Sequence, residues 1–184
     1  MKRIFIAVKI EPGETLSGMI SSLKSGLRNE NIKWTNPENI HITLSFLGDT
    51  EEEMISAVNT MLKEKCEGFG KFELVIKGSG VFKSLADPRV IWTGIELSPG
   101  LIRLNEVIKD GLKKTGIRIE DRPFNPHLTL GRIKTVKDKN VLKSLLDKYQ
   151  NLEIQKTVTD EVILFESILL NTGPIYKPIG KYKL

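Results

Sequence analysis

The sequence predicts a mixed α+β fold in two lobes, because strands and helices alternate, the order of elements repeats, and no linker separates the repeats. The element order of residues 1–85 returns in residues 86–184, and 86 residues separate His41 from His127. This period is too long for a solenoid and is typical of a duplicated half-domain. No Pro/Ser-rich stretch divides the halves, so we expect a single bilobal domain over residues 1–184.

The chain begins with a predicted strand and a predicted helix. Residues 3–10 form a continuous apolar run, rich in branched side chains and closed by Pro12 and Gly13, which indicates a buried strand. Apolar residues then recur at three- and four-residue steps over residues 16–27, which predicts a helix with one buried face.

The first half continues with a strand, a helix and a strand. Residues 40–47 alternate polar and apolar side chains, as a strand with one solvent face does, and we expect this strand to end at Gly48. Thr50 and Glu53 have the spacing of a capping box, and a helical apolar stripe follows over residues 54–62. Residues 72–82 predict a strand that is bent or bulged at Gly78 and Gly80.

The second half predicts the same order of elements and adds strands at its end. Its expected helices cover residues 98–115 and about 138–149. Its expected strands lie at residues 89–97, at 126–133, within 152–170 and at 176–184.

Composition limits the class of protein. The 184 residues are long enough for one good core, and no apolar run approaches the ~18 residues of a membrane span. Met1 leads into a short strand-like stretch rather than a signal peptide, so we expect a soluble, cytoplasmic protein without membrane association. Cys66 is the single cysteine, which excludes an internal disulfide, and with two histidines the chain has no Cys/His cluster for zinc. No feature predicts an interface between copies, so we expect a monomer, although the sequence leaves the oligomeric state open.

The net charge of +5 is concentrated in the second half of the chain. Residues 113–143 include nine basic and three acidic side chains. This distribution suits a polyanionic ligand, and a solvated basic face is an equal alternative on charge alone. The nine are Lys113, Lys114, Arg118, Arg122, Arg132, Lys134, Lys137, Lys139 and Lys143.

Both histidines lie in the same tetrapeptide pattern, His-apolar-Thr-Leu, once in each half. On a strand, residues two apart share a face, so His41 points with Thr43, and His127 points with Thr129. The leucine and the apolar residue of each copy then point into the core. If an approximate two-fold axis relates the lobes, the two strands can face each other across a central cleft and bring both His–Thr pairs to one point.

This set of groups suits in-line displacement at phosphorus. One imidazole can accept a proton from the attacking oxygen while the other protonates the leaving oxygen. The two threonine hydroxyls can bind the non-bridging oxygens as negative charge builds on them. Acid, base and anion donors are all present, so we expect no metal and no cofactor.

Two alternatives remain open for the histidines. They could be ordinary polar strand residues beside strand-forming threonines. They could also ligate a metal, but no Asp or Glu lies within either predicted strand to complete the ligand set.

Arg132 is a candidate phosphate ligand, because arginine can bind two phosphate oxygens at once. Strict alternation from His127 would direct Arg132 to the opposite face of the strand. It reaches the cleft only if the strand bulges at Gly131, which glycine permits. A surface charge is the alternative.

The paired tetrapeptides resemble the signature of the two-histidine (2H) phosphoesterase superfamily, and the flanks are similar to its RNA 2′,3′-cyclic phosphodiesterase branch, also described as 2′-5′ RNA ligase. The similar stretches occur in family order over most of the chain. They are residues 3–8, 39–48, 89–94 and 122–132.

The resemblance implies a bilobal α+β fold with two antiparallel-rich sheets, helices packed outside and the active site in the cleft between the lobes. It implies metal-independent hydrolysis of a 2′,3′-cyclic phosphate, on an RNA end such as a tRNA fragment or on a cyclic nucleotide, to a 2′-phosphomonoester. His41 would donate a proton to the departing 3′-oxygen and His127 would activate water, while Thr43, Thr129 and Arg132 would hold the phosphate. The residues alone do not assign acid and base, because the halves are equivalent.

Two other functions fit the same residues. The first is 2′-5′ RNA joining, which is the reverse chemistry at the same site. The second is an RNA-end binding module with little catalysis that uses the basic stretch, and it predicts salt-sensitive RNA affinity that survives the loss of both imidazoles.

Overall fold

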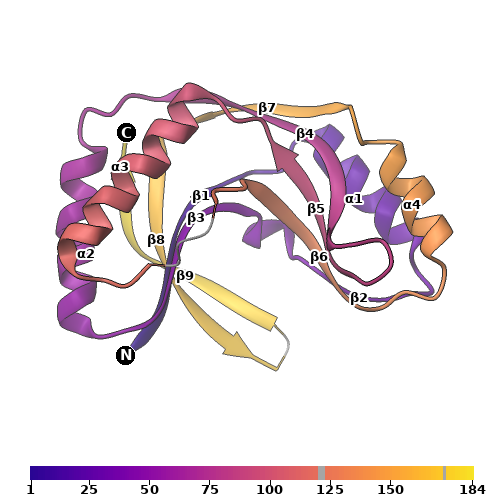
Figure 1. Cartoon of the computed structure of the whole chain (residues 1–184), viewed down its shortest axis with the longest axis horizontal. Coiled ribbons are helices and arrows are strands. Elements are labelled where there is room, and N and C mark those ends of the chain that lie inside the picture. Colours follow the sequence, from indigo (N-terminus) through magenta and orange to yellow (C-terminus); the bar gives the residue numbers. More distant parts are fainter. Residues whose placement is uncertain (120–122, 172) are drawn as a thin grey trace.

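The fold is α+β, as expected, with four helices outside a strongly curled antiparallel sheet (Figure 1). The computed structural model describes residues 1–119, 123–171 and 173–184. Its helices are α1 (Glu14–Gly26), α2 (Glu52–Cys66), α3 (Pro99–Thr115) and α4 (Lys139–Asp147). Its strands are β1 (Lys2–Lys9), β2 (Asn31–Trp34), β3 (His41–Thr50), β4 (Phe72–Lys83), β5 (Pro88–Ile95), β6 (His127–Thr135), β7 (Glu153–Thr159), β8 (Glu161–Leu170) and β9 (Gly173–Lys183).

The strand order of the sheet is symmetric about its centre, since equivalent strands of the two sequence halves lie at equal distances from the middle of the sheet. It runs β7-β4-β5-β6-β3-β1-β8-β9, with β2 paired to β6. In each half of the chain the fourth strand crosses to the other lobe: β4 pairs with β5, and β8 pairs with β1. Each lobe therefore contains strands from both halves of the sequence.

The two expected sheets are joined edge to edge into one. β3 and β6 meet at a single Cα pair, Ile42 with Leu128, and both side chains are fully buried. On either side of this junction β3 and β6 diverge, each into its own lobe (Figure 1). The junction therefore coincides with the centre of the strand order and places the two histidine strands next to each other.

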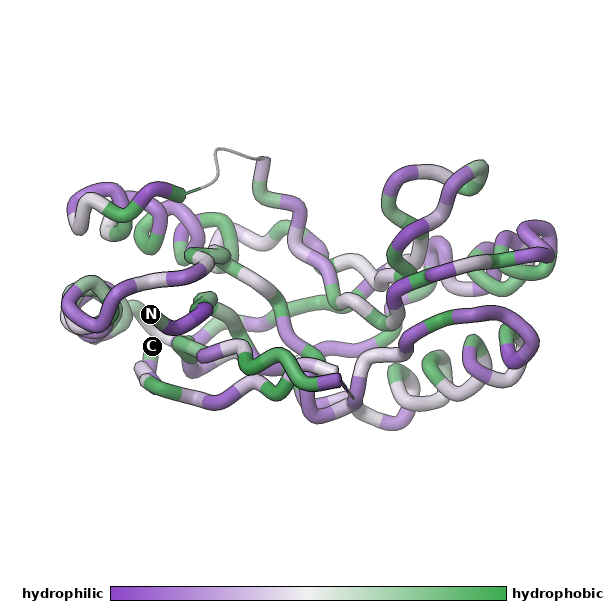
Figure 2. The backbone as a smooth tube through the Cα atoms, turned by 90° about the horizontal axis from the view of Figure 1, so that it is seen from below, coloured by the Kyte–Doolittle hydropathy of each residue, from purple (hydrophilic) through white to green (hydrophobic). Residues whose placement is uncertain are grey.

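The helices cover each lobe in pairs. α2 packs against α3 on the lobe of β1, β3, β8 and β9, and α1 packs near α4 on the lobe of β4 to β7 (Figure 1). Along the helices, hydrophobic and hydrophilic residues alternate, as expected for one buried and one solvent face (Figure 2). The buried faces join the sheet in one large core that spans both lobes, from Ile4 on β1 to Leu142 on α4.

Most predicted elements are present, two expectations at their ends were wrong, and one strand was missed. β3 continues past Gly48, which has φ 72° and pairs with Ile4, up to Thr50. Thr50 is therefore a strand residue whose hydroxyl donates to the Gly48 carbonyl, and the expected capping box does not form. Instead, Glu51 is the N-cap of α2 and makes no side-chain capping bond. β2 was not expected at all, because four residues are too short to show a period.

Candidate active site

The two His–Thr pairs lie on one face of the sheet, at the junction of β3 and β6. The pairing of Ile42 with Leu128 brings the flanking residues of both strands together, His41 and Thr43 on β3 with His127 and Thr129 on β6, and all four line one pocket. The strands are thus neighbours in one sheet rather than facing each other across a gap.

A bulge follows the threonine in both copies of the motif. On β6, Thr129 pairs with Trp92 and Gly131 with Ile91, so Leu130 is an extra residue without a partner. Leu130 and Gly131 are consecutively buried, and the next residue, Arg132, returns to the face of the histidine. The condition for Arg132 to reach the cleft is therefore met, and Arg132 lines the same pocket as His127 and Thr129.

The matching bulge on β3 falls at Leu44, because Thr43 pairs with Ala7 and Ser45 with Ile6. It brings Phe46 into the pocket at the position equivalent to Arg132, five residues after the histidine. The guanidinium of Arg3 lies over the Phe46 ring, 5.1 Å from its centroid. The two equivalent positions therefore carry different side chains, an aromatic ring on β3 and a guanidinium on β6.

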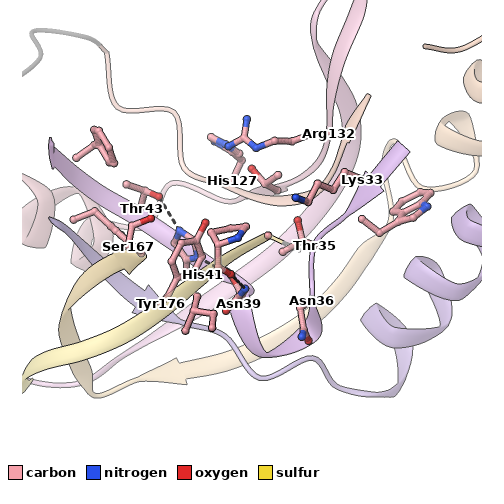
Figure 3. A pocket seen from close by; sticks show the side chains of 17 residues that line it. Lys33, Thr35, Asn36, Asn39, His41, Thr43, His127, Arg132, Ser167 and Tyr176 are labelled. Atoms are coloured by element: carbon pink, nitrogen blue, oxygen red, sulfur yellow. Dashed lines mark hydrogen bonds between the residues drawn. The ribbon is translucent and has the colours of Figure 1, made fainter. Parts of the chain in front are cut away.

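The pocket has a volume of about 480 Å³, which lies in the usual range of ligand sites. All five predicted site residues line it, so the structure brings them together (Figure 3). Its other walls come from β1, from β2 and the segment that follows it, from β3, and from the hairpin of β8 and β9. These walls are Phe5, Lys33, Trp34, Thr35, Asn36, Asn39, Phe46, Ser167, Gly173, Pro174, Ile175 and Tyr176.

Backbone carbonyls hold both imidazoles in the same orientation. The Nδ1 atom of His41 lies 2.7 Å from the Asn39 carbonyl oxygen, and Nδ1 of His127 lies 2.8 Å from the Asn125 carbonyl oxygen. Since a carbonyl only accepts, each Nδ1 carries a proton, and each Nε2 is the atom that can exchange one. In neutral His41, Nε2 accepts from the Thr43 hydroxyl at 3.1 Å (Figure 3).

Aromatic rings pack against both imidazoles. Phe5 and Tyr176 lie 5.0 and 5.2 Å from the His41 ring, and Phe82 lies 4.6 Å from the His127 ring, edge to face. Phe5 belongs to a small hydrophobic cluster with Ala7, Ile163 and Phe165, separate from the main core. This packing limits the rotation of the rings and removes water from one side of His41.

The pKa of His41 is lowered from its ordinary value of 6.5, mainly because burial removes water from the charged imidazolium. The hydrogen bond to the Asn39 carbonyl opposes this shift, whereas the charges of His127 and Arg132 add to it. His41 is therefore neutral over a wider pH range than an ordinary histidine.

Sequence reasoning missed several pocket residues. Lys33 and Tyr176 come from segments without a recognisable motif, and only long-range strand pairing brings them to the site. Asn39 lies within a stretch already singled out for its resemblance, but its two roles depend on geometry: its carbonyl orients His41, and its side-chain amide donates to the Pro174 carbonyl at 3.0 Å. The second bond fastens the β9 end of the hairpin to the pocket.

The basic stretch does not form one surface at the pocket. Of its described members, only Arg132 lines the cavity. Lys113 and Lys114 lie at the end of α3 on one lobe, and Lys143 lies on α4 on the other, where it forms an ion pair with Asp147. Arg122 lies outside the described residues.

The described residues contain neither a cluster of metal-binding side chains nor a helix that could cross a membrane. Their His, Cys, Asp and Glu side chains form no group of three or more that could hold a metal ion. No helix in the described part of the chain is long and apolar enough to cross a membrane.

The chain is similar to known proteins over nearly its whole length. The family model for LigT-like phosphoesterases matches residues 7–92 and 95–176. Proteins of Methanothermobacter thermautotrophicus and Thermotoga maritima, both named RNA 2′,3′-cyclic phosphodiesterase, are 33% and 36% identical to it. The first alignment covers 99% of this chain and 98% of the relative, and the second covers 95% and 91%.

Solved structures share the fold. A Thermus thermophilus protein superposes with a TM-score of 0.81 at 25% identity, covering 99% of this chain and 97% of the other. E. coli LigT, crystallised with 3′-AMP, superposes with a TM-score of 0.73 at 22% identity, covering 100% and 98%.

Proposed function

Because the chain belongs to the LigT-like phosphoesterase family, we propose that it hydrolyses the 2′,3′-cyclic phosphate at an RNA end, or on a nucleoside, to a 2′-phosphomonoester. The observation that carries this proposal is the arrangement of two Nε2 atoms and two threonine hydroxyls on one face of the sheet, beside Arg132, in one pocket. The names of the relatives, RNA 2′,3′-cyclic phosphodiesterase, agree with this chemistry.

In the proposed reaction, water attacks phosphorus opposite the 3′-oxygen. Nε2 of His127 accepts a proton from the water, the bond between phosphorus and the 3′-oxygen breaks, and the imidazolium of His41 donates its Nε2 proton to that oxygen. A 2′-phosphate and a free 3′-hydroxyl result. Thr43, Thr129 and Arg132 stabilise the charge on the non-bridging oxygens.

The lowered pKa of His41 can be reconciled with its role as the acid. Arg132 is one cause of the lowered pKa, and a bound phosphate places negative charge beside both groups. An anion within a few ångströms favours the imidazolium. Substrate binding thus favours the protonated form of His41, which takes its proton from solvent and donates it to the leaving oxygen.

We propose that one copy of the chain is sufficient and acts in the cytoplasm on RNA ends such as tRNA fragments. Both His–Thr pairs and Arg132 belong to the same chain, so the site needs no residue from a second copy. The pocket binds the terminal phosphate, which all such RNA ends share.

The test uses adenosine 2′,3′-cyclic phosphate in excess EDTA, with product identified by phosphorus NMR. We expect turnover to adenosine 2′-phosphate that EDTA does not inhibit, because acid, base and anion donors are all side chains. His41→Ala and His127→Ala should each lower kcat by about 10²-fold or more. Thr129→Ala should lower kcat about tenfold or more, whereas Thr135→Ala, at the exposed end of the same strand and outside the pocket, should not.

Full activity in both histidine variants would contradict the proposal. A wild-type protein without turnover but with salt-sensitive RNA affinity would instead indicate an RNA-end binding module. Efficient joining of paired RNA ends without hydrolysis would indicate the ligase reaction.

A further inference from the structure

Lys33 is a second cation in the pocket, and no role has been assigned to it. β2 pairs antiparallel with β6, and in this register Lys33 lies directly opposite Arg132. Both residues line the pocket. Figure 3 shows their side chains entering it from neighbouring strands, with Thr35 next to Lys33.

The two cations lack a compensating acid. The lining residues of the pocket include no Asp or Glu among those described. Within the described ranges, neither Lys33 nor Arg132 has an ion pair or a side-chain hydrogen bond. Like charges directly opposite each other on adjacent strands destabilise a sheet. Bound anions would remove this repulsion, so the arrangement favours an anionic ligand.

The two cations enter the pocket from neighbouring strands, and Lys33 reaches the hairpin of β8 and β9. Arg132 shares its strand with His127 and Thr129. Lys33 is on the next strand, about 4.8 Å away across the sheet. A Cβ placed on Gly173 would lie 3.4 Å from both Cε and Nζ of Lys33. The end of the Lys33 side chain therefore lies against the start of β9, which can give it a different anion from the one beside His127 and Thr129.

Thr35 adds a neutral donor beside this cation. It lines the pocket two residues after Lys33, and its backbone N–H is already used in a 2.9 Å bond to the bulged Leu130 carbonyl. That bond fixes Thr35 against β6, and its hydroxyl makes no hydrogen bond within the described chain. An ammonium and a hydroxyl on a fixed segment are suitable donors for a phosphate.

We propose that Lys33 and Thr35 form a second phosphate subsite, which binds the phosphate on the 5′ side of the terminal nucleotide. This inference rests on the proposed function, since it assumes that the cyclic phosphate occupies the His–Thr site. It makes the preferred substrate a nucleotide chain end with at least two phosphates rather than a cyclic nucleoside phosphate alone.

The experiment compares three substrates at constant ionic strength: adenosine 2′,3′-cyclic phosphate, the same compound with a 5′-phosphate, and the dinucleotide adenylyl-adenosine 2′,3′-cyclic phosphate. The enzyme variants are wild type, Lys33→Gln and Lys134→Gln. Lys134 is the matched control, because it is an exposed lysine on β6, two residues from Arg132 and outside the pocket.

We expect the wild type to prefer the substrates that carry the second phosphate. Lys33→Gln should lower kcat/KM for the dinucleotide about 10- to 100-fold, mostly through KM, as the loss of one charge-assisted hydrogen bond does. On the cyclic nucleoside phosphate, Lys33→Gln should lower kcat/KM by no more than about threefold. Lys134→Gln should change kcat/KM by no more than about threefold on either substrate. The slope of log affinity against log salt for the dinucleotide should fall by about 0.7 in Lys33→Gln.

The two phosphorylated substrates distinguish the source of the second phosphate. A gain with the dinucleotide alone identifies an internucleotide diester, and an equal gain with the 5′-phosphate identifies a phosphate of either kind. No gain with either would overturn the proposal. An equal loss on all three substrates in Lys33→Gln would also overturn it, because Lys33 would then act on the reacting phosphate.

Binding of products separates this proposal from the proposed function. Calorimetry with adenosine 2′-phosphate and with adenylyl-adenosine 2′-phosphate needs no turnover. If the wild type hydrolyses none of the three substrates but binds the dinucleotide product more tightly, and Lys33→Gln removes that difference, the second subsite stands and the proposed reaction fails. A matching urea midpoint for Lys33→Gln and wild type shows that the variant is folded.

Discussion

At the scale of single residues, the two equivalent histidines differ mainly in how far the pocket excludes water from the imidazole. His41 lies between Phe5 and Tyr176, and burial is the first cause of its lowered pKa. Arg132 and His127 lower the pKa further. Removing the charge of Arg132 should therefore raise the pKa of His41 in part, while the lowering due to burial remains.

This predicts the outcome of an NMR titration of the His41 imidazole. The signal that disappears in His41→Gln should titrate below 6.5 in the wild type, and Arg132→Gln should raise that pKa without restoring the ordinary value. As the pH falls between the ordinary and the lowered pKa, the unfolded chain binds a proton that the folded chain does not, so the free energy of unfolding decreases with falling pH.

Lys134→Gln serves as the control and should leave the His41 titration unchanged. A wild-type His41 that titrates above 6.5, or an Arg132→Gln variant with a still lower pKa, would contradict the assigned causes.

The residues of the site were predictable to different degrees, for physical reasons. His41, Thr43, His127 and Thr129 could be predicted because alternation on a strand depends only on neighbours in the sequence. Arg132 depended on a bulge that the sequence permits but does not require. Lys33 and its subsite were not predictable, because they depend on the pairing of β2 with a strand about 100 residues away, as its register with Arg132 shows.

At the scale of elements, the two bulges give the site its shape, and each bulged carbonyl needs a donor. The Leu130 carbonyl accepts from the backbone N–H of Thr35. The Leu44 carbonyl has no such strand neighbour and instead accepts from the side-chain amide of Asn105, a buried residue of α3, at 3.1 Å. A helix residue thus fixes the strand next to Thr43.

Asn105→Ala should lower the free energy of unfolding by about 1–3 kcal/mol, because the buried Leu44 carbonyl loses its donor. It should also lower kcat on adenosine 2′,3′-cyclic phosphate, because Thr43 and His41 precede the bulge directly. Urea denaturation and steady-state kinetics measure the two effects. The exposed Asn140→Ala is the control, and a variant of Asn105 with unchanged stability and rate would show that the bulge does not depend on this bond.

At the scale of the whole molecule, the exchanged strands make the two halves of the sequence dependent on each other. β4 belongs to residues 1–85 but pairs with β5 and β7, and β8 belongs to residues 86–184 but pairs with β1. The repeat was visible in the sequence as a repeated order of elements. The exchange was not visible, because the order along the chain is the same whether β4 and β8 stay in the lobe of their own half or cross to the other.

We therefore predict that neither 1–85 nor 86–184 folds alone. Each fragment separately should show no cooperative unfolding transition by circular dichroism, because each would leave long strand edges and apolar helix faces without partners. An equimolar mixture should recover structure and phosphodiesterase activity. A cooperative transition in either isolated fragment would contradict this prediction and would indicate two independent domains.

The unequal residues at the fifth position after each histidine, Phe46 and Arg132, bear on how a substrate enters the pocket. Two identical halves would bind a ligand equally well in either of two opposite orientations. With an aromatic ring at one of the two equivalent positions and a guanidinium at the other, the two orientations are no longer equivalent. A duplicated frame can thus act on a substrate that has no symmetry of its own.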